Sequence, residues 1–153
     1  MDKNQTICAS CGAQWQDHQS CTDAFHQLLA WEWDNPQELF AVHHLMVLCY
    51  HLQHPHLYSP QTLQEAIRIL EEFVIHNKTP GQIRKEKSAA WNNQNRIFKV
   101  TGTNHTQGSY PVQPQWQFTI QTVIEGGERH YIENVRAWAD TILKTLHTMK
   151  LVS

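Results

Sequence analysis

The sequence predicts a mainly α-helical fold that forms a single domain over residues 1–153. Apolar residues recur at helical spacing in several long segments, and pairs in which Asn, Ser or Thr precedes proline stand at three helix starts. A chain of 153 residues, 41% of them hydrophobic, has the size and composition of one folded domain. We expect four parts: a cysteine loop over 1–20, helices over 21–91, an irregular segment over 92–128, and a C-terminal helix over 129–150.

The first helix is expected to run from Cys21 or Thr22 to Trp33. Its apolar side chains stand three and four positions apart, which is the spacing of one helix face. The hydroxyl of Thr22 or the carboxylate of Asp23 is suited to accept a hydrogen bond at the N-cap. The apolar residues on that face are Phe25, Leu28 and Leu29.

A second helix is expected over 37–54, antiparallel to the first, so that the two form a helical hairpin. Asn35 is suited to cap it and Pro36 to occupy its first turn, where a missing amide costs no hydrogen bond. Apolar side chains surround this helix almost completely, which is typical of a central, buried helix. Pro55 ends it, since the residue before a proline avoids the helical conformation.

Two further helix starts follow the hairpin. Ser59 is suited to cap a third helix and Pro60 to begin it. Thr79 repeats this signal before a weaker fourth helix over 80–91, whose apolar face is thin. The third helix carries a regular apolar stripe, made of Leu63, Ala66, Ile67, Leu70, Phe73 and Val74.

The last part of the chain is expected to be irregular at first and helical at its end. Glycines and prolines interrupt regular structure around 92–118, where a short strand is expected over 96–101. A short helix is predicted over 119–125, ended by the two glycines that follow. A regular apolar stripe predicts the last helix over 129–150. The core should consist of the second, third and last helices.

Charge and hydropathy disfavour two classes of partner. Charged residues make up 17% of the chain and its formal net charge is -2, so nucleic acid is not an expected partner. The longest apolar run, residues 45–50, is far shorter than the roughly 20 residues that span a bilayer. Residues 1–6 are polar and lack the apolar core of a signal peptide. We therefore expect a cytoplasmic protein with reduced cysteines and no membrane partner.

The cysteines indicate a metal site near the N-terminus. Cys8 and Cys11 form a CxxC pair, whose two thiolates are spaced to chelate one ion. Cys21 follows, and Zn²⁺ prefers four tetrahedral ligands of thiolate and imidazole type. In the predicted hairpin, Cys21 lies at the same end as His54, so these four residues are our predicted zinc ligands. The substitutes for the imidazole ligand are His51 and His56. A closed set of three thiolates and one imidazole is typical of structural zinc.

A second cluster is expected along the hairpin. His43 lies about three helical turns from His54, too far to share its ion. It is expected to meet Glu32 or His26 across the hairpin, and it is either a core histidine with a satisfied hydrogen bond or a functional group. An imidazole beside a carboxylate supports general acid–base chemistry or metal binding. His43 and Glu32 are therefore the candidate catalytic residues of an alternative function, a small metal-dependent hydrolase or transferase. A third alternative is a protein-interaction module that uses the segment 92–116.

Several motifs together resemble a family of bacterial proteins classed only as a domain of unknown function. The resemblance covers most of the chain and is strongest between Cys8 and Pro55. It implies that the cysteines and histidines of these motifs belong together, and it brings no activity. An acidic residue of the family's second helix is replaced by Leu48 here. The motifs are Cys8-x-x-Cys11-Gly12, Cys21, Val42-His43-x-Leu45, Tyr50-x-x-Gln53-His54-Pro55 and Val135-Arg136-x-Trp138-Ala139.

Overall fold

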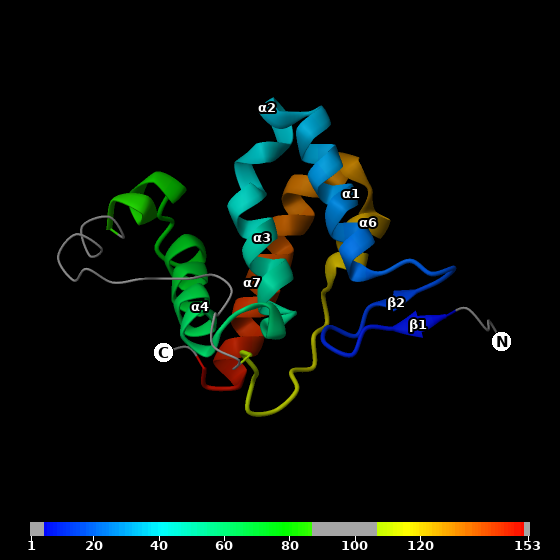
Figure 1. Ribbon diagram of the computed structural model, residues 1–153. Helices are drawn as coiled ribbons and strands as arrows, with labels where there is room; N and C mark the ends of the chain where they lie inside the picture. The colour runs from blue at the N-terminus through cyan, green and yellow to red at the C-terminus, as the bar shows by residue number, and fades with distance from the viewer. Residues whose placement is uncertain (1–4, 87–106, 152–153) are drawn as a thin grey trace.

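The computed structural model describes residues 5–86 and 107–151, and these are mainly helical, as the sequence predicts (Figure 1). Residues 80–86 are helical as well. The elements, with 3₁₀ helices written η, are β1 (Thr6–Ile7), β2 (Gln14–Trp15), α1 (Cys21–Asp34), α2 (Pro36–Leu39), η1 (Phe40–Val42), α3 (His43–Leu52), η2 (Pro55–Leu57), α4 (Pro60–Val74), α6 (Ile120–Gly126), η3 (Glu128–His130) and α7 (Tyr131–Thr148).

The N-terminal cysteine loop contains a small β-hairpin that the sequence does not predict. β1 pairs antiparallel with β2, so that Thr6 lies opposite Trp15 and Ile7 opposite Gln14. Strands of two residues are too short to show the alternation of apolar and polar residues that identifies a strand. The hairpin turns the chain back on itself and brings it to the start of α1 (Figure 1).

The start of α1 corrects one prediction. The helix begins at Cys21, but its N-cap is Ser20, not Thr22 or Asp23. The hydroxyl of Ser20 accepts a hydrogen bond from the backbone amide of Asp23 at 3.2 Å and donates one to the Asp23 carboxylate at 3.0 Å. A cap must precede the first helical residue and have extended backbone geometry, and Ser20 has both properties.

The predicted second helix is divided in the structure. It begins at Pro36, as expected, but the 3₁₀ turn η1 separates α2 from α3, and α3 ends at Leu52. In a 3₁₀ turn, side chains three positions apart project on the same side. Leu39 and Val42 are both buried, with 6% and 1% of their surface exposed, so the tighter turn directs both into the core. The division also leaves His43 as the first residue of α3.

The core lies between α3, α4 and α7 and extends to α1 and α6. α3, α4 and α7 pack against one another, as predicted, and α7 also contacts α6, which lies beside α1 (Figure 1). One face of α7 is buried throughout. Its fully buried residues include Tyr131, Val135, Trp138, Ala139, Ile142 and Leu146.

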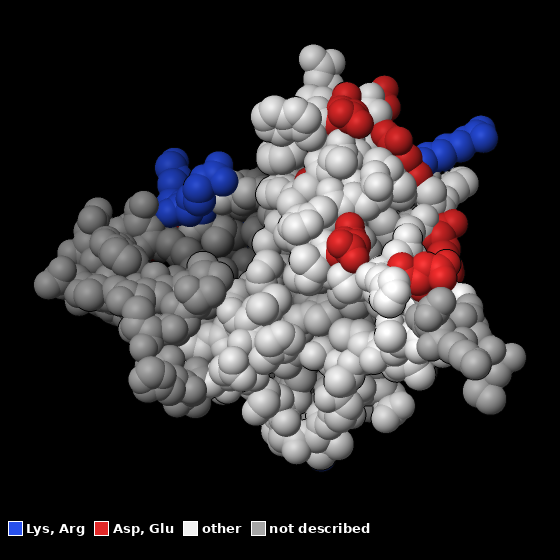
Figure 2. Space-filling model, turned by 45° about the vertical axis from the view of Figure 1, so that its right-hand side comes forward, with Lys and Arg blue, Asp and Glu red and all other residues white. Residues whose placement is uncertain are grey.

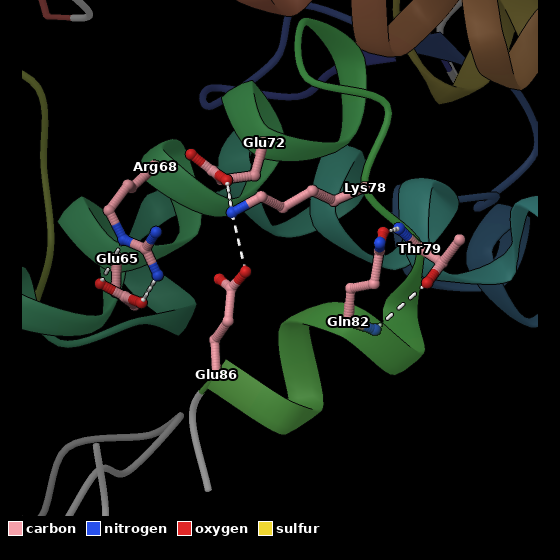
Figure 3. A network of polar contacts seen from close by, with 7 residues as sticks. All are labelled: Glu65, Arg68, Glu72, Lys78, Thr79, Gln82 and Glu86. Carbon is pink, nitrogen blue, oxygen red and sulfur yellow. Dashed lines mark hydrogen bonds and ion pairs between the residues drawn. The ribbon is translucent and has the colours of Figure 1, made fainter. Parts of the chain in front are cut away.

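A polar network joins α4 to the helical residues 80–86 (Figure 3). Lys78 forms ion pairs with Glu72 of α4 and, at 2.8 Å, with Glu86. Thr79 and Gln82 exchange hydrogen bonds between side chain and backbone amide, at 2.8 and 3.1 Å, which caps this helix as the sequence predicts. The rest of the predicted fourth helix and the strand predicted over 96–101 lie outside the described residues, as does most of the segment 92–116.

The segment before α6 crosses the turn that follows α3. The hydroxyl of Tyr110 donates to the Leu52 carbonyl at 2.5 Å, and the side chain of Gln53 donates to the Phe118 carbonyl at 2.7 Å. The amide of Gly108 donates to the Tyr58 carbonyl at 2.7 Å. These hydrogen bonds hold the turn over 53–58 against the segment before α6. α6 itself occupies its predicted place, capped by Thr119 and ended at Gly127.

Figure 2 shows the charged side chains on one face of the molecule. Acidic side chains are spread over its upper, central and right-hand parts, while basic side chains stand together at the left and project again at the upper right. Within residues 5–86 and 107–151, no helix has the length and hydropathy needed to cross a membrane.

We expect Gly108→Ala to destabilise the fold. A Cβ atom at Gly108 would lie 2.9 Å from the Pro55 carbonyl oxygen and 3.2 Å from that of Tyr58, so the backbone of the turn would have to shift. Overpacking of this kind costs about 1–3 kcal/mol. Urea unfolding followed by circular dichroism measures the change. Gly81→Ala is the matched control, because its Cβ would meet side-chain atoms only at 3.8 Å or beyond. Equal stability of the two variants would contradict this account.

Candidate metal centre

The CxxC pair lies in a tight turn between β1 and β2. The amide of Cys8 donates to the Ala13 carbonyl at 2.8 Å, and the amide of Gly12 donates to the Cys8 carbonyl at 2.9 Å. Gly12 has φ +86°, a conformation that residues with a Cβ rarely adopt. Backbone hydrogen bonds from Cys11 and Ala13 reach the sulfurs of Cys8 and Cys11 respectively. The turn therefore orients both sulfurs and stabilises negative charge on them.

Cys21 enters the same site from the first turn of α1. Its side chain is 7% exposed, and its sulfur lies 3.5 Å from that of Cys11. The indole nitrogen of Trp15 donates a hydrogen bond to the Cys21 sulfur at 3.3 Å. A helix N-terminus also favours a negatively charged side chain. Trp15 is thus a supporting residue of the site. Trp15 was not predicted as a site residue, because a strand as short as β2 has no recognisable sequence pattern.

His54 completes the group from the turn after α3. Its Nδ1 donates to the Tyr50 carbonyl at 2.6 Å, and its Nε2 faces the site, 3.6 Å from the Cys8 sulfur. Metal-binding histidines usually donate their second ring nitrogen to a carbonyl or carboxylate in this way. Of the predicted alternatives, His56 is exposed, and the ring of His51 stacks on Tyr58. Neither belongs to the group.

The distances fit a tetrahedral ion. One ligand atom from each of Cys8, Cys11, Cys21 and His54 lies within 4.8 Å of all the others, and three of the four residues are buried. A zinc ion with bonds of about 2.3 Å to sulfur and about 2.0 Å to nitrogen places two sulfurs about 3.8 Å apart and a sulfur and a nitrogen about 3.6 Å apart. The observed 3.5 Å and 3.6 Å lie close to these values. The group can therefore hold a metal ion such as zinc.

The electrostatics of the group favour a cation at its centre. Hydrogen bonds from Cys11 and Cys21 lower the pKa of the Cys8 thiol, while the contacts of Cys11 with Cys21 and Cys8 raise the pKa of Cys11. Burial opposes charge on His54, but its hydrogen bonds with Cys21, Cys8 and the Tyr50 carbonyl together raise its pKa to about 9. Crowded sulfurs thus resist ionising together, and a divalent ion would displace the protons that they otherwise keep.

The second predicted cluster lies at the other end of α1 and α3. Nδ1 of His43 is 2.7 Å from one carboxylate oxygen of Glu32, and the hydroxyl of Tyr131 donates to the other at 2.6 Å. Glu32, and not His26, is the partner of His43. Burial, followed by the contact with Glu32, raises the pKa of Tyr131. Tyr131 was not predicted to join this cluster, because nothing in the sequence pairs it with Glu32, although it stands on the buried face of α7, four positions before Val135. Within the described residues, the group able to hold a metal does not include His43.

Fold and site together define a mainly helical protein with an N-terminal Cys₃His group able to hold a metal ion. The chain belongs to the family of unknown function DUF5946, whose model matches residues 6–147. No curated protein and no solved structure matches the chain.

Proposed function

We propose that this protein is a zinc-binding domain in which one structural zinc ion is held by Cys8, Cys11, Cys21 and His54. The observation that carries the proposal is the convergence of four ligand atoms within 4.8 Å, from the hairpin turn, the start of α1 and the turn after α3. The chemistry of the donors selects the metal. Thiolates and imidazole together favour zinc over magnesium or calcium, which prefer oxygen ligands.

A structural role is supported by the number of ligands and by their places in the chain. Four protein ligands complete a tetrahedral zinc site, whereas catalytic zinc keeps one position for water or substrate. A cavity of about 310 Å³ touches Cys8, Cys21 and His54, so chelators have access to the edge of the site. The ion would cross-link residues 6–15 to the helices that follow, and the domain would then include the whole cysteine loop.

We expect the purified protein to contain about one zinc ion per chain, and we expect Cys11→Ser to lose it. Replacing the Cys11 thiolate with a serine hydroxyl leaves three ligands and one uncharged group, which lowers the affinity for zinc. Free zinc about a thousandfold above its Kd stabilises a fold by about 4 kcal/mol. For a domain of this size, losing that stabilisation corresponds to a fall in Tm of roughly 8–16 °C. Elemental analysis and thermal melting of the same preparations measure the two effects.

Cys49→Ser is the matched control for that experiment. Cys49 is fully buried but lies inside α3, so its variant should keep zinc even if the core is weakened. His43→Ala should also keep zinc, because His43 is at the far end of α3. Metal-free protein that melts like the zinc-loaded protein would refute the structural role. Loss of zinc from His43→Ala would mean that the metal site lies near His43 and not at the Cys₃His group.

We expect Trp15→Phe to weaken zinc binding without unfolding the protein. Phenylalanine keeps the apolar ring but removes the indole N–H that donates to the Cys21 sulfur. Changes to such supporting groups typically reduce metal affinity about 10- to 100-fold. Competition with a chromogenic chelator gives the affinity. Trp33→Phe serves as the control, since 86% of the Trp33 surface is exposed. The same affinity in both variants would mean that the N–H to sulfur bond contributes nothing.

A further inference from the structure

We propose that the cavity beside His43 binds a small aromatic compound with a hydroxyl group, which forms a hydrogen bond with Nε2 of His43. The cavity has a volume of about 820 Å³, within the range of about 300–1,000 Å³ that is typical of small-molecule sites. It lies at the turn between α1 and α3, away from the Cys₃His group. The inference therefore does not depend on the metal.

His43 presents its Nε2 to the cavity, whose lining also includes the exposed side chain of His26. Glu32 is only 2% exposed, and its two oxygens are occupied by Nδ1 of His43 and the hydroxyl of Tyr131. His43 is one-third exposed, and its Nε2 has no hydrogen-bond partner among the described residues. A buried carboxylate that holds Nδ1 fixes the orientation of the ring, as it does where a histidine serves as a base.

The walls of the cavity favour a flat, apolar ligand. The ring of Phe40 stacks on that of His43 with a centroid distance of 4.5 Å and an angle of 9°. Phe40 and Trp33 both line the cavity and are 53% and 86% exposed, which is unusual for such large apolar side chains. Leu29, Ala30 and Pro36 form the rest of the apolar wall. Aromatic ligands pack well against such rings.

The charges around the cavity select the polar group of the ligand. Its lining residues include Glu32 and Asp34 but neither lysine nor arginine within the part of the chain that the structure describes, so an anion is disfavoured. A hydroxyl donates to a neutral imidazole and accepts from a protonated one, so it pairs with His43 in either state. A phenol-type compound meets both the apolar and the polar demands of the site.

The test compares 2-naphthol with 2-methoxynaphthalene, which has the same rings but no hydroxyl hydrogen. Full-length protein with its native metal content is titrated with each compound and followed by NMR. We expect 2-naphthol to bind about three- to tenfold more tightly, the usual effect of one hydrogen bond. We also expect it to shift the ¹⁵N resonance of Nε2 in His43. This second readout needs no variant.

His43→Phe should abolish the preference for 2-naphthol while keeping the stacked ring, and His147→Phe, at an exposed site on α7, should leave it unchanged. The proposal would be overturned by equal binding of the two compounds to the unmodified protein, or by an unshifted His43 resonance in the presence of bound 2-naphthol. It would also be overturned if sedimentation showed a dimer and Trp33 were buried in its interface, since a second copy would then cover the cavity.

Discussion

The convergence of three sulfurs and one imidazole is the constraint on which the N-terminal half of this structure depends. The hairpin over residues 6–15 has two-residue strands, which contribute few hydrogen bonds of their own. Cys8 and Cys11 hold it against Cys21, at the start of α1, and His54, in the turn after α3. Hydrogen bonds from the Gln14 amide to the Gln121 side chain and from the Gln113 side chain to the Ser10 carbonyl also hold it. The turn that carries His54 is in turn fixed by the segment before α6, through Gly108, Tyr110 and Phe118. The site therefore unites parts of the chain that lie far apart in sequence.

The buried carboxylate of Glu32 is the second organising feature, and it has a different character. A carboxylate in an apolar core is unfavourable unless its oxygens are bonded, and here Tyr131 and His43 provide both bonds. One of these partners is completely buried and the other reaches the cavity. The network therefore joins α7 in the core to the cavity beside His43. Simple packing would not require this connection.

Much of this arrangement follows from sequence patterns. The CxxC pair, the third cysteine and the proline-bounded hairpin were enough to bring Cys21 and His54 together, because helix direction and length fix which residues share an end. Local choices were harder to predict. Ser20 rather than Thr22 caps α1 because backbone geometry decides between neighbouring oxygens. The 3₁₀ turn at 40–42 places Leu39 and Val42 in the core, and the role of Tyr131 depends on a contact with a residue 99 positions away. Tertiary contacts of that kind leave no periodic signal.

The placement of the two groups on the same pair of helices has a consequence for how they are related. Cys21 and Glu32 stand near opposite ends of α1, and His43 and His54 flank opposite ends of α3. A change in the angle between α1 and α3 would therefore alter the geometry of both groups. A ligand that bound one site more tightly at a particular angle between the helices would shift the other site toward that angle as well, because thermodynamic linkage is reciprocal. Any binding event at the Cys₃His group that changed this angle would therefore also change the alignment of the Glu32–His43 pair.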